Sequence, residues 1–374
     1  MPTGQSKIVA RIVSEAGIPQ LLTVLSRDLA ASDLQSLLLH VYQARAAALR
    51  PVDLMRKAGQ GLVAPSHAPA RLLNQFDGVA FDMAEGFDGV ELAPAGPLGL
   101  SHVLGGIDQN NVLTTIRGVE VLGDSTSALA LECSRRRKAG SGAVVRLCAS
   151  HRVVRLQPFD VPGYSPHFRL FALVSAGPDT GSNAFEIQHL TEHIRFYLRL
   201  FEALNQIGFR FGSPLVEISD LALIEMLLAA QATAPEDVRQ SIRAHRLGGS
   251  ATFLAERGVM LPEAIEDPVA ELSSSGPRVH LLALIKSAVV EPLRDEFPAA
   301  QFRFNLARLE GLGYYPGLCL RISPLAGDGN RYPVVDGGFT DWTARLLNNQ
   351  KERFLASGMG SEFACLRYRD LGRA

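Results

Sequence analysis

Two apolar runs of strand length flank a turn-forming segment between residues 146 and 177. The first run reads RLCASHRVVRL and the second FRLFALVSAG, and three prolines and a glycine fall between them. Val-, Leu- and Phe-rich runs separated by proline and glycine are typical of paired strands joined by a turn. We therefore predict a long antiparallel hairpin, with Arg155 at the end of its first strand.

Helical spacing of apolar residues predicts helices on both sides of this hairpin. Residues 185–207 form an amphipathic stripe, and residues 1–75 read as helical. In the N-terminal region, Ser32 to Gln35 match a capping box and Pro51 begins a short helix. This region is either a helical cap on the core or a partner-binding module.

A second group of short elements precedes the hairpin. The segment 86–94 reads as a short strand, and residues 114–121 as another. Asp124 is a plausible N-cap for a helix over residues 128–137. Distant strands with helices between them predict an α+β domain with an antiparallel sheet. No phosphate-binding glycine motif occurs in strand–turn–helix context, which argues against Rossmann and P-loop chemistry.

The C-terminal part alternates between helical and strand patterns. Residues 214–300 are mainly helical, and residues 301–374 return to strands with a helix over 341–347. We therefore divide the chain into a helical region over 1–75, a core over 76–213 and 301–374, and a helical insertion over 214–300.

Composition narrows the function classes. The 374 residues are 47% hydrophobic and 20% charged, with a formal net charge of −1, so the chain can form a large core and shows no general electrostatic affinity for nucleic acid. The four cysteines are far apart in apolar contexts, which indicates reduced thiols and a cytoplasmic protein. The sequence contains no long uncharged apolar stretch, so we predict no membrane span.

Two polar patterns are candidates for chemistry. Arg155 faces an aromatic-flanked loop, and a permanently charged guanidinium is suited to phosphate oxygens. His189 and His193 lie four residues apart on the predicted helix over 185–207. They occur in HLTEH rather than HExxH, so we interpret them as a solvated polar face and predict no metal site.

Short patches over residues 80–370 resemble, in order, the catalytic core of class II aminoacyl-tRNA synthetases, most closely the histidyl branch. GFDGVELAP is similar to motif 1, DST to the family's Glu-x-Thr, and the hairpin to motif 2. EGLGYYPG is similar to Arg-Gly-Leu-Asp-Tyr-Tyr-Thr-Gly, and DGG to part of Gly-Gly-Arg-Tyr-Asp. The resemblance implies a class II synthetase-like antiparallel sheet flanked by helices.

The resemblance also implies a set of site residues. Arg155 corresponds to the catalytic arginine that binds the ATP α-phosphate, beside Gln157, and Phe168 or Phe171 to the side chain that stacks on adenine. Asp124 corresponds to the acid that holds the substrate α-amino group. The remaining implied substrate-binding residues are Thr126, Leu170, Val174, Glu310, Tyr314, Tyr315, Gly337 and Gly338.

Several residues depart from the histidyl pattern. Glu310 replaces an arginine that binds the carboxylate and α-phosphate, so an attraction for anions becomes a repulsion. Leu170 and Val174 occupy the positions at which the family has polar side chains that bind the imidazole of the substrate histidine. Phe363 stands where motif 3 has its ATP-binding arginine, which Arg353, Arg367 or Arg369 could replace only if the backbone places one of them correctly.

These departures predict a histidyl-tRNA synthetase-like paralogue that does not charge tRNA. We expect it to bind an amino acid or nucleotide as a regulatory or partner subunit, similar in plan to the regulatory subunit of ATP phosphoribosyltransferase. The alternative is an adenylate-forming ligase that activates a non-histidine amino acid for a non-tRNA acceptor, and a third option is a purely structural paralogue with an empty site. ATP or another nucleotide is a possible cofactor, with Mg²⁺ only if ATP is used. We expect a homodimer through the 86–94 strand and the helix near Ala128, and a possible protein partner at the N-terminal helices.

Overall fold

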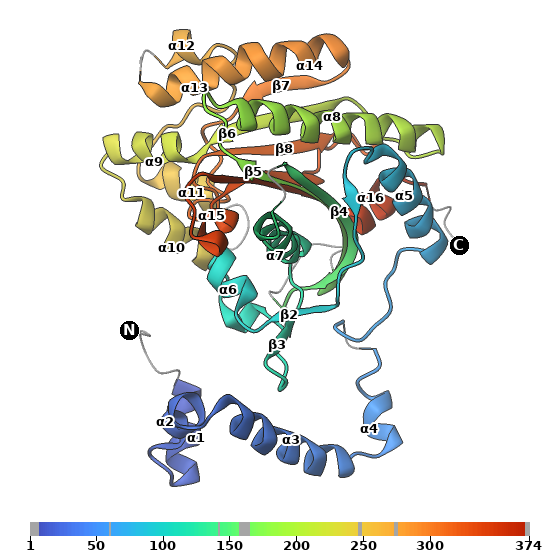
Figure 1. Ribbon diagram of the computed structural model, residues 1–374, viewed down its shortest axis with the longest axis vertical. Helices are drawn as coiled ribbons and strands as arrows, with labels where there is room; N and C mark the ends of the chain where they lie inside the picture. The colour runs from blue at the N-terminus through green and yellow to red at the C-terminus, as the bar shows by residue number, and fades with distance from the viewer. Residues whose placement is uncertain are drawn as a thin grey trace.

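An eight-stranded sheet forms the centre of the computed structural model, which describes residues 7–59, 61–140, 143–156, 165–245, 249–272 and 276–370 (Figure 1). Its strand order is β1-β4-β5-β10-β9-β8-β6-β7. The strands are β1 (Asp88–Gly89), β4 (Val145–Val154), β5 (His167–Pro178), β6 (Pro214–Asp220), β7 (Gln301–Phe304), β8 (Leu318–Pro324), β9 (Val335–Thr340) and β10 (Glu352–Met359). A separate pair joins β2 (Ala95–Pro97) and β3 (Val119–Val121).

The main sheet is largely antiparallel, which confirms the predicted α+β class. Parallel pairing occurs only where β1 joins β4 and where β6 joins β7, among the strands of the described ranges. β10 is paired with β5 on one side and β9 on the other, so it connects the two halves of the sheet.

The predicted hairpin consists of β4 and β5. They pair in antiparallel register from Val145 opposite Ala176 to Val154 opposite His167. The connection over residues 157–164, with the predicted turn prolines and Gln157, lies outside the described residues.

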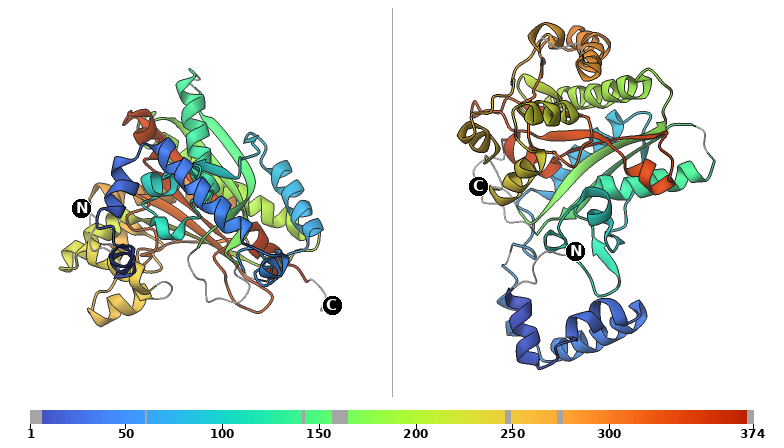
Figure 2. Two further views of the ribbon diagram at one scale, coloured as in Figure 1. Left: turned by 90° about the horizontal axis from the view of Figure 1, so that it is seen from below. Right: turned by 90° about the vertical axis from the view of Figure 1, so that its left-hand side faces the viewer.

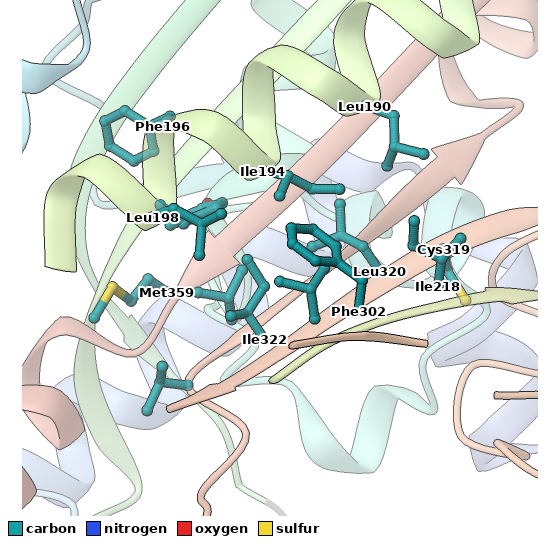
Figure 3. Packing of buried hydrophobic residues seen from close by; sticks show 14 of the residues in the cluster. Leu190, Ile194, Phe196, Leu198, Ile218, Phe302, Cys319, Leu320, Ile322 and Met359 are labelled. Carbon is teal, nitrogen blue, oxygen red and sulfur yellow. The ribbon is translucent and has the colours of Figure 1, made fainter. Parts of the chain in front are cut away.

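Each face of the sheet carries its own hydrophobic core. On one face lie α5 (Ala70–Met83) and α8 (Ala184–Gln206), and Figure 3 shows side chains of α8, including Leu190 and Ile194, packed over strand residues such as Leu320 and Ile322. The other face holds α7 (Ser125–Lys138), whose Leu129 and Ala130 are fully buried against β4, β5 and β10. Alternating side-chain direction along each strand supplies both cores.

The prediction of a solvated polar face on α8 is wrong, because both of its histidines are buried. His189 is 1% exposed and His193 is fully buried. The His193 ring lies 3.1 Å from Ser175 Oγ and 2.7 Å from Ser357 Oγ, on β5 and β10. α8 is also covered from the insertion side, where its Arg195 pairs with Glu296.

The helical insertion begins after β6, which belongs to the main sheet. It consists of α9 (Leu221–Ala230), α10 (Pro235–His245), α11 (Gly249–Glu256), α12 (Pro268–Glu271), α13 (Pro277–Ile285), η3 (Lys286–Val290) and α14 (Glu291–Glu296). After the insertion, β7 returns to the edge of the sheet beside β6. Three short helices complete the core: α6 (Leu100–Gly105), α15 (Trp342–Leu347) and α16 (Ser361–Arg367).

The N-terminal helices form an arm that stands apart from the core (Figures 1 and 2). They are α1 (Lys7–Ala16), α2 (Leu21–Thr23), η1 (Val24–Asp28), α3 (Ala31–Ala47) and α4 (Pro51–Met55), and none contains a buried residue. The predicted capping box is wrong, because α3 begins at Ala31 and places Ser32 inside its first turn. The arm is therefore not a cap on the core.

The connection between arm and core is fixed to the sheet. The Ser66 hydroxyl donates to Glu362 Oε1 at 2.5 Å, and His167 Nε2 lies 2.7 Å from the carbonyl oxygen of Ala64. Within the described ranges no single helix is long and apolar enough to cross a membrane. The bent pair of α1 and Leu21–Asp28 would be long and apolar enough together, by length and composition only.

Candidate ligand pocket

A cavity of about 440 Å³ opens on the α7 side of the sheet. It is bounded by the start of α7, the end of β4, the start of β5, β10 and the segment 308–315. The predicted residues that line it are Asp124, Thr126, Arg155, Leu170, Glu310, Tyr314 and Tyr315. Segments far apart in the sequence thus meet in one pocket, as the motif order predicts.

Asp124 has a double role at one end of the pocket. Its Oδ1 accepts hydrogen bonds from the Thr126 amide and hydroxyl, both at 2.8 Å, which makes it the N-cap of α7 as predicted. Its Oδ2 accepts a hydrogen bond from the Tyr314 hydroxyl at 3.3 Å. One carboxylate oxygen therefore holds the helix while the other faces the cavity, where it can receive an amine.

Arg155 lies beside Asp124 at the end of β4. Its Nε donates to the Gly123 carbonyl at 2.8 Å, and its Nη2 is 3.9 Å from Asp124 Oδ2. The guanidinium is also 5.3 Å from the centre of the Phe168 ring. The side chain is 34% exposed, so donors remain available to a phosphate or carboxylate.

A second arginine, which the sequence interpretation missed, lines the opposite wall. Arg308 donates to Asp336 Oδ2 at 2.7 Å, to the Leu320 carbonyl at 3.0 Å and to the Glu310 carbonyl at 3.1 Å. Its side chain is 1% exposed. Burial alone lowers the pKa of Arg308, but the adjacent Asp336 carboxylate more than offsets this and raises it, so the charge is permanent.

Glu310 carries its carboxylate into the same wall. Arg321 Nη2 lies 3.5 Å from Glu310 Oε2, while Arg321 Nε lies 3.7 Å from Asp336 Oδ2. Three carboxylates, those of Asp124, Glu310 and Asp336, thus lie close to three guanidinium groups, those of Arg155, Arg308 and Arg321. The paired charges leave no excess of positive charge for a polyanion.

Aromatic and aliphatic side chains form the rest of the lining. Tyr314 packs edge-on against Trp342, with 5.4 Å between ring centres, and Tyr315 donates its hydroxyl to Asp336 Oδ1 at 3.0 Å. Burial raises the pKa of both tyrosines well above the usual value, so they remain neutral donors. Ile107, Val112 and Leu170 add an apolar surface.

The helix α6, at the mouth of the pocket, is held by a buried acid. Glu120 accepts hydrogen bonds from the amides of Gly99 and Ser101, both at 2.8 Å. Burial opposes its charge, but these hydrogen bonds outweigh burial and lower the pKa of Glu120. Ser101 and Gly105 of α6 line the cavity as a result.

Some predicted ligand contacts lie elsewhere. Phe171 is fully buried on the opposite face of the sheet, where it stacks on Phe196 with 5.8 Å between ring centres, so it cannot reach an adenine in the pocket. Val174 is fully buried in the α7 core and does not line the cavity. Phe168 lies beside Arg155 but outside the lining. Gln157 lies outside the described residues.

The two glycines support the pocket from beneath. A Cβ on Gly338 would lie 2.6 Å from the Tyr315 ring, and one on Gly337 would lie 2.5 Å from Ser357 Cβ. Both residues line no part of the cavity, so they are packing positions rather than ligand contacts. Glycine at 338 therefore leaves the space that the Tyr315 ring occupies against the strand.

None of the three arginines considered as a motif 3 substitute reaches the pocket. Arg353 pairs with Asp179 at 2.5 Å, and Arg367 lies 3.7 Å from Asp328. Arg369 donates to the carbonyl of Ile207. Phe363 itself packs edge-on against Tyr332.

The position of Arg308 in the sequence explains why its place in the pocket was not predicted. It lies two residues before Glu310, in the run FRFNLAR that sequence patterning treats as a strand. β7 ends at Phe304, so residues 305–308 form a connection that brings the side chain back to the pocket. Within the described ranges, no three His, Cys, Asp or Glu side chains form a group that could hold a metal ion.

The mixed eight-stranded sheet, the hairpin of β4 and β5 and the pocket between α7 and β10 form a class II aminoacyl-tRNA synthetase-like fold. Solved structures of histidyl-tRNA synthetases have a similar fold. The chain is similar to an ATP phosphoribosyltransferase regulatory subunit/histidyl-tRNA synthetase from Bacillus halodurans, with a TM-score of 0.61, 13% identity and coverage of 82% of each chain.

Two further structures show the same fold. A histidyl-tRNA synthetase from Nostoc matches with a TM-score of 0.60 and 16% identity, over 81% of this chain and 73% of that one. A histidine–tRNA ligase subunit from Alicyclobacillus acidocaldarius matches with a TM-score of 0.60 and 15% identity, over 85% and 97%. No family model and no curated protein matches the sequence.

Proposed function

We propose that this chain is a histidyl-tRNA synthetase-like paralogue that binds an amino acid through its amine, as a regulatory or partner subunit that does not charge tRNA. The observation that carries the proposal is Glu310, which lines the pocket where the resemblance implies an arginine and whose carboxylate lies 3.5 Å from Arg321. A carboxylate there repels the α-phosphate and carboxylate that an adenylate would place beside it.

The geometry of the two ends supports an amine with an apolar body. Asp124 has one carboxylate oxygen directed to the cavity, and no cation other than Arg155 lies within 4 Å of it among the described residues. Leu170, Ile107 and Val112 supply the apolar end. An amino acid would place its carboxylate near Arg155, which explains why an acid and a base are adjacent at one end of the site.

Three properties belong to the same proposal. A nucleotide is a weaker second ligand, because Arg308 is neutralised by Asp336, and Mg²⁺ would accompany it only if the nucleotide is ATP. Cytoplasmic location is favoured by four buried, unpaired cysteines. Homodimer formation through residues 86–94 is expected from the motif 1 resemblance, whereas α7 is largely covered within its own protomer.

The alternative function is an adenylate-forming ligase for a non-histidine amino acid. The observation that favours it is that Arg155 and Arg308 line the same pocket as Asp124, so two guanidinium groups face the space where an adenylate would form. Burial of Arg308 and its pairing with Asp336 weaken this reading, because the pair leaves less net positive charge for phosphate.

Calorimetry with amino acids and nucleotides tests the two functions. We expect an apolar amino acid to bind the wild-type chain, to bind more weakly to Asp124→Asn and Arg155→Ala, and to bind Glu310→Gln at least as well. Amino-acid-dependent ATP–pyrophosphate exchange would support the ligase instead. If no amino acid binds the wild-type chain, the proposal is contradicted.

A further inference from the structure

The insertion helices hold the segment that carries the two tyrosines of the pocket. We call residues 311–317 the tyrosine segment, because they include Tyr314 and Tyr315. The segment is a turn, in which the amides of both tyrosines donate to the Gly311 carbonyl at 2.8 and 3.0 Å. Gly311 and Gly313 have positive φ angles, of 100° and 79°. Glycine adopts many backbone conformations at little cost, so the position of the segment depends on the residues that surround it.

Arg239 of α10 packs directly against this segment. A Cβ on Gly313 would lie 3.1 Å from Arg239 Cδ and 3.2 Å from its Nε, so the arginine lies against bare backbone. Two carboxylates fix the arginine in turn. Its Nη2 donates to Glu225 Oε1 at 2.6 Å, and its Nη1 donates to Glu236 Oε2 at 3.0 Å. Glu225 belongs to α9 and Glu236 to α10, so two insertion helices set the contact with Gly313.

Arg278 of α13 holds the other end of the segment. Its Nη2 donates to the Pro316 carbonyl at 3.5 Å, and its Nη1 lies 3.4 Å from Asp220 Oδ2. Asp220 is fully buried and caps α9 through its other carboxylate oxygen. The Leu221 amide donates to the Gly317 carbonyl at 3.1 Å. The start of α9 and the end of the tyrosine segment are therefore fixed to each other.

The segment reaches the ligand end of the pocket through Tyr314. Its hydroxyl donates at 3.3 Å to Asp124 Oδ2, the oxygen that is proposed to receive the amine. This distance is long for a hydrogen bond between two oxygens, so a small displacement of the segment would break it. Neither Arg239 nor Arg278 lines the cavity, so each can affect a ligand only through the segment.

We propose that Arg239 and Arg278 are positioning residues for the ligand pocket, which hold the tyrosine segment so that Tyr314 orients Asp124 toward the amine. The inference rests on the proposed function, because the binding that it controls is that of the amine at Asp124. It makes the insertion part of the ligand site, although none of the insertion's described residues lines the cavity.

Trp342 reports the position of the segment without any ligand. It is the only tryptophan of the chain, is 1% exposed and packs edge-on against Tyr314 with 5.4 Å between ring centres. In the folded full-length chain, Arg239→Ala should shift the fluorescence emission to longer wavelength and increase its quenching by acrylamide. Lys286→Ala is the matched control, because Lys286 is an insertion cation of similar exposure, 28% against 27%, that pairs with Asp267. It should leave the emission unchanged.

Calorimetry with an apolar amino acid measures the effect on the pocket. Arg239→Ala should weaken binding at least about fivefold. Arg239→Lys keeps the Cδ that lies against Gly313 and should bind within about twofold of wild type. Arg278→Lys keeps a positive charge beside Asp220 but lacks the planar fork that also reaches Pro316, so it should weaken binding as well.

A double-mutant cycle distinguishes positioning from a general loss of stability. In the Tyr314→Phe background, Arg239→Ala should cost less affinity than in wild type, because the hydroxyl that it positions is already absent. Additive losses would overturn the inference, as would wild-type emission of Trp342 in Arg239→Ala or an equal effect of Lys286→Ala. If no amino acid binds wild type, the proposed function fails, and the emission of Trp342 alone decides whether Arg239 positions the segment.

Discussion

Arg308 and Asp336 form an ion pair at 2.7 Å in which the two partners differ sharply in burial. The guanidinium is 1% exposed, whereas the Asp336 carboxylate is 46% exposed. The buried Arg308 charge therefore depends on Asp336 as its counterion, whereas the Asp336 carboxylate remains accessible from the pocket.

Asp336→Asn should destabilise the chain by about 3 kcal/mol, because it leaves the buried Arg308 charge without its counterion. Urea unfolding measures this change. Glu310→Gln is the control, since Glu310 is half-exposed and 3.5 Å from Arg321, and it should change the free energy of unfolding by less than about 1 kcal/mol. Equal effects of the two variants would contradict the assigned dependence.

Two substitutions of Asp124 distinguish its role in helix capping from its proposed role in ligand binding. Asp124→Asn keeps a good N-cap and should leave stability nearly unchanged, whereas Asp124→Ala should cost about 1 kcal/mol. Both variants remove the negative charge and should weaken amine binding. Thermal unfolding and calorimetry on the same samples distinguish these effects, and an amine that binds both variants as tightly as wild type would exclude Asp124 as its partner.

Histidine should not support ATP–pyrophosphate exchange. The pocket lacks a described motif 3 arginine and has a carboxylate at Glu310, and each lost contact to a developing anion costs about 3 kcal/mol in comparable sites. Radiolabelled pyrophosphate exchange with histidine checks this directly. Robust exchange would refute the prediction, while exchange with an apolar amino acid would favour the ligase.

The apolar end should discriminate against histidine as a ligand. Burying an imidazole against Leu170 without hydrogen-bond partners costs about 1–3 kcal/mol, or roughly 5- to 150-fold in affinity. Competition calorimetry between histidine and an apolar amino acid of similar size measures the ratio. Leu170→Gln should reduce the ratio, and preferential histidine binding by wild type would be incompatible with this lining.

Stability should fall on mild acidification because of His193. Burial lowers the pKa of His193 to about 3, while the unfolded chain protonates near the ordinary value of 6.5. Between these two values the unfolded state binds the extra proton, so stability decreases as the pH falls, by about 1.4 kcal/mol per unit at most. Urea unfolding at pH 7 and pH 5 measures the slope, and His193→Asn should reduce it. An unchanged slope in the variant would assign the acid sensitivity to other groups.

The hairpin, α7 and the Tyr314–Tyr315 wall were predictable because each depends on local signals: strand-length runs, an N-cap and a short motif. Arg308 was not, since its place depends on where β7 ends and the chain turns back. The two histidines of α8 also look solvent-facing in the sequence. Only the packing of a strand face and insertion helices around α8 buries them, and those contacts are distant in the sequence.

The position of Gly338 illustrates the same limit for motifs. Its sequence context resembles a ligand-binding strand, yet the space its missing Cβ leaves is filled by the Tyr315 ring. The motif identified the correct region of the fold, while the division between ligand contacts and supporting positions required the register of β8, β9 and β10.

The place of β10 has a consequence for synthesis of the chain on the ribosome. This strand, residues 352–359, lies between β5 and β9 and is the last strand to be translated. Until it emerges, two half-sheets, β1-β4-β5 and β9-β8-β6-β7, each expose an unpaired inner edge. Closure over such a long separation is slow compared with local pairing. A nascent chain stopped before β10 therefore exposes two unpaired strand edges and an open pocket. We expect chaperones to bind such a chain.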